Sequence, residues 1–315
     1  MTAVEQLRLG LFIGVVVSVY FLSAGILIRK LLGRPHPFGR KAVWLRWVIL
    51  GLAALGTLCI AYGFFIEPYW PQVTQVRIAS PKVPRGSRPV RIVHLSDLHC
   101  DASPRLEERL PDLIAAQHPD VIVFTGDSIN SPEGLPVFRR CMTRLAEIAP
   151  TFAVRGNWDV WYWPNLDLFG GTGVQELRGE AVGKVIDGTP VCVAGVAYDS
   201  EEQIGRVLGP IPAEALTVFL YHTPDEFEAV AQRRADVYCA GHIHGGQIAL
   251  PLYGALITLS KYGKRYEAGL YRVGGTWLYV NRGIGMEGGR MPRVRFCSRP
   301  EVTVIEIHPP DHESQ

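Results

Sequence analysis

The sequence lacks the cysteine pattern of a disulfide-stabilised or thiolate-zinc protein. Its cysteines are scattered and form no CxxC pair: Cys59, Cys100, Cys141, Cys192, Cys239 and Cys297. This spacing argues against a disulfide framework and against a structural zinc held by thiolates. The chain also has no internal repeat, no low-complexity linker and no GxxxxGK[ST] phosphate loop, which argues against the P-loop nucleotide-binding class.

A large excess of charge is also absent, because the formal net charge of the 315 residues is only +2. The balance is nevertheless uneven along the chain. Residues 1–71 carry seven Lys and Arg against two Asp and Glu, whereas the remainder carries 25 against 28. Because a nucleic-acid-binding domain is usually basic, the acidic remainder leads us to expect no nucleic-acid partner.

Charges are missing altogether from two stretches of 20 residues, 9–28 and 47–66. Each is long enough to cross about 30 Å of hydrocarbon as a helix. We therefore expect residues 1–71 to form a transmembrane hairpin in contact with a lipid bilayer, and residues 72–315 to form one enzyme domain. Trp44, Trp47, Tyr69 and Trp70 lie near the ends of the stretches, where aromatic side chains favour the membrane interface.

The loop between the two stretches is basic, with Arg29, Lys30, Arg34, Arg40, Lys41 and Arg46. The positive-inside rule puts such a loop in the cytoplasm and the enzyme domain outside. A cytoplasmic substrate of the kind considered below requires the opposite orientation, so the side of the domain stays open.

Five short apolar runs, at 91–99, 121–127, 151–157, 217–222 and 237–244, each end on a residue that can bind a metal ion. Their Val, Ile and Phe content predicts buried strands. Ligands of layered α/β folds gather beyond the carboxyl ends of the strands. We therefore expect the following side chains to converge: Asp97, His99, Asp127, Asn157, His222, His242 and His244. A single residue of this kind at a strand end is usually a turn residue or a satisfied polar group, but five in order are not. His94, inside the first run, is predicted to be a strand residue.

These ligands favour a metal site of a particular kind. Imidazole and carboxylate groups suit Mn, Fe or Zn, and seven ligands exceed the three or four that one catalytic ion takes. They fit two divalent ions if one carboxylate bridges them. Paired ions about 3.5–4 Å apart clamp the attacking and leaving oxygens of phosphoryl transfer. The pattern therefore predicts a two-metal enzyme acting on phosphate bonds.

In this order, the motifs Asp-x-His, Gly-Asp, Gly-Asn, His and Gly-His-x-His resemble the calcineurin-like metallophosphoesterases over residues 75 to 307. The C-terminal stretch YVNRGIGMEGGRMPRVRFCSRPEVTVIEI resembles a bacterial membrane-associated branch of that family. The resemblance implies a multi-pass protein of the bacterial inner (cytoplasmic) membrane. It also implies a four-layer αββα sandwich with mixed sheets, following the transmembrane hairpin.

The resemblance further implies how the ions are held. Asp97, His99, Asp127 and His244 would hold one ion, and Asp127, Asn157, His222 and His242 the other, with Asp127 as the bridge. The ions would be Mn, with Fe or Zn as alternatives, and a hydroxide bridging them would attack phosphorus. Asp127, Asn157 and Trp158 are the residues that we expect to be catalytic.

Trp158 marks a departure from the family, which usually reads Gly-Asn-His-Asp or Gly-Asn-His-Glu where this chain reads Gly-Asn-Trp-Asp. An indole has one neutral donor and no titratable proton near pH 7. Loss of a general acid harms poor leaving groups most, so Trp158 favours phosphoanhydrides and activated diesters over alkyl monoesters. Two alternatives remain open: Arg155 or another nearby group supplies the missing contact, or the site binds metal as a non-catalytic scaffold.

The substrate expected from these features is phosphorylated and amphiphilic. UDP-2,3-diacylglucosamine pyrophosphatases, a family branch that also lacks this His but typically carries Arg, cleave a lipid-linked pyrophosphate at the membrane. A general phosphodiesterase acting on nucleotides is the alternative. The aromatic residues Trp161, Tyr162 and Trp163 could form a platform for a base, sugar or lipid, but we expect Trp161 and Trp163 to pack against the core.

The remaining pattern predicts an α/β domain in which strands and helices alternate early and strands dominate late. Strands are expected at 72–80, 174–197, 268–281 and 293–307, and helices after Pro104 and Gly134.

Overall fold

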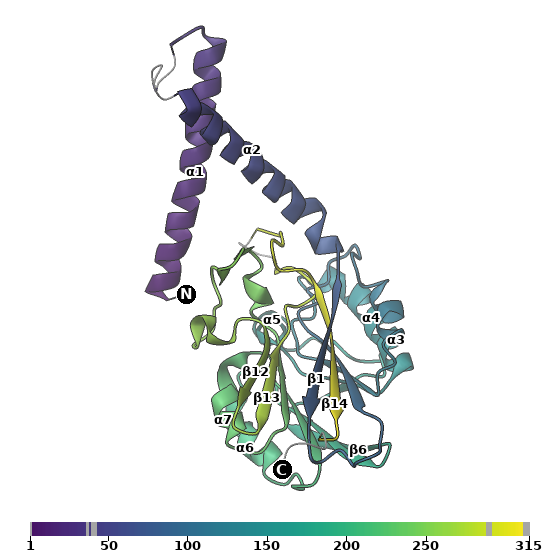
Figure 1. Ribbon diagram of the computed structural model, residues 1–315. Coiled ribbons are helices and arrows are strands. Elements are labelled where there is room, and N and C mark those ends of the chain that lie inside the picture. The colour runs from purple at the N-terminus through teal and green to yellow at the C-terminus, as the bar shows by residue number, and fades with distance from the viewer. Residues whose placement is uncertain (1, 36–37, 39–42, 288–291, 311–315) are drawn as a thin grey trace.

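The computed structural model describes residues 2–35, 38, 43–287 and 292–310. Two long helices come first, α1 (Ala3–Leu31) and α2 (Val43–Phe65), and both project from one end of the α/β part of the chain (Figure 1). Both helices are long and apolar enough to cross a membrane, and few of their residues are buried. Of the loop charges used to predict topology, Arg40 and Lys41 lie outside the described residues.

Two six-stranded mixed sheets form the centre of the α/β part. The first has the order β1-β14-β2-β3-β4-β5, in which only β14 and β2 pair antiparallel. Its strands are β1 (Gln72–Ala79), β2 (Val90–Leu95), β3 (Val121–Phe124), β4 (Thr151–Ala153), β5 (Gln175–Glu176) and β14 (Glu301–His308).

The second sheet has the order β12-β13-β9-β8-β7-β6, with parallel pairing in its centre and antiparallel pairing at both edges. Its strands are β6 (Glu180–Ile186), β7 (Thr189–Gly195), β8 (Leu216–Leu220), β9 (Val237–Ala240), β12 (Gly269–Val273) and β13 (Thr276–Val280). A small antiparallel ribbon of β10 (Ala249–Leu250) and β11 (Gly254–Ala255) stands apart from both sheets.

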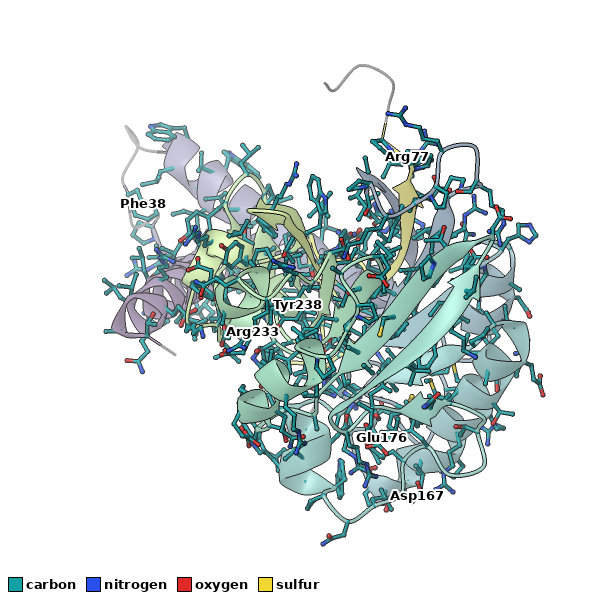
Figure 2. All side chains as sticks on the ribbon, turned by 90° about the horizontal axis from the view of Figure 1, so that it is seen from below. Phe38, Arg77, Asp167, Glu176, Arg233 and Tyr238 are labelled. Carbon is teal, nitrogen blue, oxygen red and sulfur yellow. The ribbon has the colours of Figure 1, made fainter. Side chains whose placement is uncertain are left out.

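Alternating side chains build three apolar cores, and these define four layers. Ile92 and Val123 point between the two sheets, whereas Val93 and Phe124 point to the outer face of the first sheet. That outer face packs against α3 (Leu110–Ala115) and α4 (Leu135–Ile148). The outer face of the second sheet packs against α6 (Ile204–Leu208) and α7 (Phe227–Ala231). Figure 2 shows side chains filling the spaces between the layers, and Tyr238 of the outer core is labelled there. The expected αββα sandwich with mixed sheets is confirmed.

The last predicted strand needs a correction, because β14 begins at Glu301 and not at residue 293. The reason is Arg295, which is fully buried and donates to the carbonyl oxygens of Arg282, Gly285 and Ser298. A guanidinium surrounded by turn carbonyls holds this segment in a compact loop, so it cannot extend as a strand. Residues 288–291 of the C-terminal stretch lie outside the described residues.

Candidate metal centre

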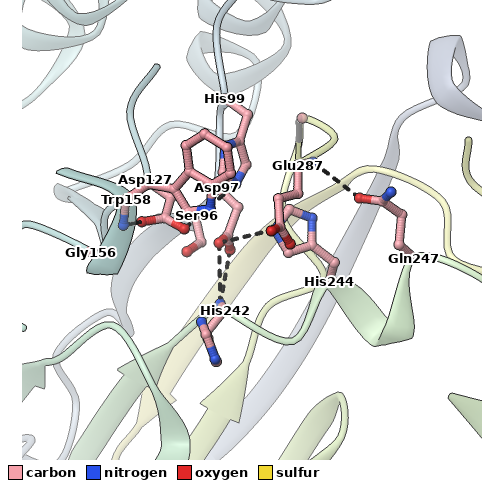
Figure 3. Close-up of polar contacts among 12 residues, drawn as sticks. Ser96, Asp97, His99, Asp127, Gly156, Trp158, His242, His244, Gln247 and Glu287 are labelled. Carbon is pink, nitrogen blue, oxygen red and sulfur yellow. Dashed lines mark hydrogen bonds and ion pairs between the residues drawn. The ribbon is translucent and has the colours of Figure 1, made fainter. Parts of the chain in front are cut away.

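The seven predicted ligands lie at one end of the two sheets, directly after strands β2, β3, β4, β8 and β9. His242 is partly buried. The other six are fully or almost fully buried: Asp97, His99, Asp127, Asn157, His222 and His244. The first sheet presents Asp97, His99, Asp127 and Asn157, and the second presents the other three histidines. Figure 3 shows Asp97, Asp127, His99 and His244 pointing toward one another.

Several ligand backbones adopt a conformation that L-residues rarely use. Five have φ in the left-handed region, at 50° for Asp97, 42° for His99, 60° for Asp127, 72° for His242 and 54° for His244. Such angles cost free energy and are concentrated at functional sites, where the surrounding contacts hold them. They turn the chain sharply after each strand, so that the side chain points back into the space between the loops.

Glycines next to the ligands are required because the loops approach closely. A Cβ on Gly156 would lie 2.2 Å from Asp127 Oδ1, and one on Gly241 would lie 1.8 Å from Ser96 Oγ. Any side chain there would separate the loops. The Gly-Asn and Gly-His motifs therefore reflect packing between ligand loops as well as the ligands themselves.

The ligand atoms form two groups that share Asp97. Those of Asp97, His99 and His244 lie within 4.8 Å of one another, which brings together three of the four residues expected at one ion. A second group joins Asp97 and Asp127 to His222. Asp127 Oδ2 lies 3.5 Å from His99 Nε2 and 3.3 Å from His222 Nε2. Asp127 thus touches ligands from both predicted sets, as a bridging carboxylate would.

The other two ligands of the second predicted ion are less closely grouped. The His242 ring lies edge-on to that of His222, with 5.1 Å between the ring centres, and His242 completes no ligand group among the described residues. Its backbone N–H instead donates to Asp97 Oδ2, at 3.1 Å. Asn157 begins α5 (Asn157–Tyr162), next to the backbone N–H of Trp158 that donates to Asp127 Oδ1 at 2.9 Å.

Buried polar atoms without partners show that the centre suits cations. His99 Nε2, His222 Nε2 and Asn157 Oδ1 are buried and have no hydrogen-bond partner among the described residues. An unsatisfied buried polar atom costs about 1–3 kcal/mol, so three of them in one place are explained by ligands that they would hold. His222 Nδ1 lies 2.7 Å from the Thr125 carbonyl oxygen, to which it donates, and this leaves Nε2 as an acceptor for a metal ion.

Electrostatics within the centre follow from two carboxylates among four imidazoles. Burial would raise the pKa of Asp97, but His244 and His222 lower it, so the carboxylate stays ionised. Burial would lower the pKa of His222, but Asp127 outweighs this and raises it to about 9. Burial lowers the pKa of His99 to about 3 and that of His242 to about 4. Both rings are therefore neutral, as metal ligands must be.

Asp159 holds the two first-sheet ligand loops together, a role that the sequence did not reveal. Its buried carboxylate accepts from the backbone N–H groups of Asp127 (2.9 Å), Ser128 (2.9 Å) and Gly156 (3.0 Å). Burial and the nearby charge of Asp127 raise its pKa to about 6. The motif contains Asp159 two residues after Asn157, but the sequence does not predict which backbone groups it binds.

Trp158 and Glu287 lie beside the ligands. The indole packs edge-on against the His99 ring, at 5.3 Å, and its side chain lies close to Glu287. Glu287, missed by sequence reasoning, also donates its backbone N–H to Gln247 Oε1 at 3.1 Å (Figure 3). Burial raises the pKa of Glu287.

One open alternative loses Arg155 as its candidate, and one expectation near Trp158 is wrong. Arg155 does not supply the missing contact, because it pairs with Glu176 at 2.7 Å and donates to the Leu166 carbonyl oxygen, away from the ligands. Trp161 does not pack in the core, because 54% of it is exposed, although it touches Tyr198 edge-on. Trp163 does pack against the core, as expected.

Comparison with known proteins identifies this centre. A sequence model described as calcineurin-like phosphoesterase matches residues 90–246, the segment that holds all seven ligands. The chain is 31% identical over 271 residues to the phosphodiesterase YaeI of Escherichia coli, covering 81% of this chain and 96% of that protein. The chain belongs to the calcineurin-like phosphoesterase family. This metallophosphoesterase is therefore a metal-dependent hydrolase of phosphoric ester or pyrophosphate bonds, and its fold implies a dinuclear divalent metal centre.

Two further relatives of this metallophosphoesterase are named for a diacylated substrate and for a transmembrane protein. The UDP-2,3-diacylglucosamine pyrophosphatase LpxG of Chlamydia trachomatis is 25% identical over 319 residues, with 81% of this chain and 94% of that protein covered. A transmembrane protein with metallophosphoesterase domain from Danio rerio is 27% identical over 288 residues, with 83% and 63% covered. Together with the two apolar helices, the Danio rerio relative indicates that the metallophosphoesterase is associated with a membrane.

Proposed function

We propose that this protein is a membrane-anchored hydrolase that cleaves a phosphoanhydride or activated phosphodiester bond in an amphiphilic, lipid-linked phosphate. UDP-2,3-diacylglucosamine represents this substrate class. In the proposal, residues 1–71 form a transmembrane hairpin in the bacterial inner membrane and residues 72–315 form the hydrolase domain. The observation that carries the preference for good leaving groups is the surroundings of Trp158.

Trp158 leaves the leaving-group side of the centre without the usual proton donor. The indole packs against His99 and lies close to Glu287, while Arg155 is committed to Glu176. A general acid typically contributes about 10²–10⁴-fold, and its absence matters least when the leaving group is already a phosphate or a nucleotide. Pyrophosphate bonds and activated diesters fit this arrangement better than alkyl monoesters.

The ligand side chains have defined tasks in this proposal. Asp97, His99, Asp127 and His244 would hold one ion, and Asp127, Asn157, His222 and His242 the other. Two such cations, most simply Mn²⁺, acidify water and offset negative charge on phosphate oxygens. Thr125 keeps His222 in the tautomer that offers Nε2, and Asp159 fixes the loops that carry Asp127 and Asn157. The backbone N–H of Trp158 orients the Asp127 carboxylate.

The lipid-linked substrate is tested directly with detergent-solubilised protein and added Mn²⁺. UDP-diacylglucosamine and bis-p-nitrophenyl phosphate are compared, with Asp127→Asn as the blank. Release of UMP from the lipid with little diester hydrolysis supports the proposal. Turnover of the soluble diester alone contradicts the proposal of a lipid-linked substrate.

That second outcome would favour a general phosphodiesterase, the activity named for the Escherichia coli relative. Trp158→His then separates the two enzymes from a scaffold. In a specialised anhydride enzyme, restoring the family histidine raises hydrolysis of an alkyl phosphate monoester by about 10-fold or more. No turnover by either form, with metals bound, contradicts the assignment of catalysis.

A further inference from the structure

The N-terminal end of α1 is bonded to a loop beside the metal centre. Glu5, buried although it lies in the first turn of α1, accepts from both the backbone N–H and the hydroxyl of Thr258, each at 3.0 Å. Thr258 lines a small cavity of about 30 Å³ together with His242, His244 and the apolar residues Ile257 and Leu259. The first helix therefore begins next to the ligands of the second sheet.

The C-terminal end of α2 is attached to another loop of the same centre. Gly63 O accepts from the backbone N–H of Arg295 at 3.0 Å, and Glu67 accepts from the backbone N–H groups of Cys297 (2.9 Å) and Ser298 (2.5 Å). Ser298 Oγ in turn donates to the His244 carbonyl oxygen at 2.5 Å. Both ends of the hairpin thus contact segments that position His244 or line its cavity.

These contacts fix the centre relative to the apolar spans. Glu5 precedes the first uncharged stretch by four residues, which is about 6 Å along a helix, and Glu67 directly follows the second. When residues 9–28 and 47–66 cross a bilayer, Thr258, Cys297 and Ser298 lie at its polar surface. The loops that carry the second-sheet ligands then lie next to the membrane surface.

The ribbon segment, residues 249–260, has the composition of a membrane-interface element. Leu252, Tyr253 and Leu259 are exposed on it, and Leu259 lines the cavity. The Tyr253 ring lies 4.4 Å from Lys264 Nζ and 5.8 Å from the Arg8 guanidinium carbon, and Arg8 is the residue immediately before the first apolar stretch. Aromatic rings flanked by basic groups favour the headgroup region, and exposed leucines add apolar area.

We propose that the ribbon segment lies in the headgroup region of the bilayer that the hairpin crosses, and that it forms the entrance through which an amphiphile brings its phosphate to the metal centre. The first part rests on the contacts between hairpin and loops. The second part rests also on the proposed function. The small cavity is lined by exposed Leu259 as well as by His242 and His244, so the apolar surface of the ribbon segment adjoins the ligands.

Position 185 provides a control, because Val185 is also a large exposed apolar side chain but lies on β6, at the end of the sandwich away from the hairpin (Figure 1). The test uses the full-length chain in vesicles of phosphatidylcholine and phosphatidylglycerol. Nitroxides are attached to Leu252→Cys, Val185→Cys and, within the second span, Leu55→Cys, after replacing Cys59 and Cys297 by Ser.

The expected result is that the label at 252 collides more with oxygen than with a water-soluble nickel chelate, whereas the label at 185 does the reverse. A label at 252 that behaves like the one at 185 overturns the inference, while a lipid-exposed label at 55 shows that the hairpin is still embedded. A water-exposed label at 55 overturns the membrane anchor, and the inference with it.

The entrance role has its own readout. Leu252→Asp should lower kcat/KM for vesicle-borne UDP-diacylglucosamine by about 10-fold, since it removes one interfacial leucine and adds a charge. Hydrolysis of soluble bis-p-nitrophenyl phosphate should not change, and Val185→Asp should alter neither rate. Equal kcat/KM values of Leu252→Asp and Val185→Asp for the vesicle-borne lipid overturn the entrance role of the ribbon segment. If wild type hydrolyses only the soluble diester, the lipid-linked substrate and the entrance role both fail, and the spin-label result decides the bilayer contact alone.

Discussion

The two sheets contribute different chemistry to the metal centre. The first sheet supplies both carboxylates, the amide of Asn157 and one imidazole, whereas the second supplies three imidazoles and no oxygen ligand. A dinuclear centre therefore forms only where the two sheets meet, and each half alone offers an incomplete set. The comparison shows that relative placement of the sheets is part of the site.

The two halves also differ in how they are held. First-sheet loops bond to one another: Asp97 N–H donates to Gly126 O at 2.9 Å and His99 N–H to Asp127 O at 3.0 Å. Second-sheet histidines depend on groups outside their own sheet, since His222 donates to Thr125 and His244 is held by Ser298. Substitutions in the first-sheet loops should therefore weaken the binding of both ions. Substitutions of the groups that support the second-sheet histidines should weaken mainly one.

Asp127→Asn should give the largest effect, because Asp127 is the predicted bridging carboxylate and its Oδ2 lies within 3.5 Å of a histidine from each half. The amide loses the negative charge that two cations require. We expect metal content per chain to fall and bis-p-nitrophenyl phosphate hydrolysis to drop by more than about 100-fold, given that outer-shell changes alone cost about 10–100-fold. Elemental analysis and steady-state kinetics measure both.

Asp120→Asn is the control for that substitution, since Asp120 pairs with Arg88 just before β3, at the opposite end of the same strand. It should keep its metal and its rate. Unchanged metal and activity in Asp127→Asn would contradict the assigned centre.

His94 is a buried histidine of the first sheet that packs within the sheet and is not one of the predicted ligands. It lies in β2 with Nε2 2.9 Å from Thr125 Oγ1, and burial lowers its pKa from 6.5 to about 4. The unfolded chain binds this proton near pH 6.5 and the folded chain only near pH 4. Stability should therefore fall as pH falls through this window, by about 3 kcal/mol from this group.

Thermal unfolding of the metal-stripped protein at pH 7 and pH 4.5 measures this loss. His99 and His242 add to it, since burial lowers the pKa of each, whereas Asp159 opposes it, since burial raises its pKa. His94→Gln should make unfolding less dependent on pH than wild type, and His118→Gln, at an exposed position, should not. Parallel pH profiles for His94→Gln and wild type would argue against this role of His94.

Asp159→Asn should weaken the hydrogen bonds that hold the first-sheet ligand loops together, without removing a ligand. The amide can accept at one oxygen only, so at least one of the N–H groups of Asp127, Ser128 and Gly156 loses its partner. We expect Mn²⁺ affinity and turnover to fall by about 10–100-fold, the range for groups that orient ligands. Titration with Mn²⁺ followed by activity separates weaker metal binding, which excess metal restores, from a general loss of folding, which it does not.

Local patterns predicted much of this architecture, and their failures are informative. Alternating apolar residues located β2, β3, β8 and β9, and the residues after them gave the candidate ligands that the structure brings together, because both signals lie within a few positions. The segment before β14 resembled a strand since nothing local marks Arg295 as buried. The bonds from Glu5 to Thr258 and from Glu67 to Ser298 span 253 and 231 positions, so no pattern in the chain predicts them.

Glu67→Gln should give the smallest effect and should be confined to the second half. Glu67 ties the end of α2 to Cys297 and Ser298, and Ser298 holds the His244 carbonyl oxygen. A glutamine keeps one acceptor oxygen, so one hydrogen bond to a charged group is lost, worth about 1.5–3 kcal/mol at most and shared with the rest of the loop. We expect the weaker-bound Mn²⁺ to lose affinity by a few-fold while the other ion is retained. Glu306→Gln, at the far end of β14, is the matched control. Equal loss of both ions in Glu67→Gln would show that the hairpin supports the whole centre, and the contrast between the two halves would then lie in their chemistry alone.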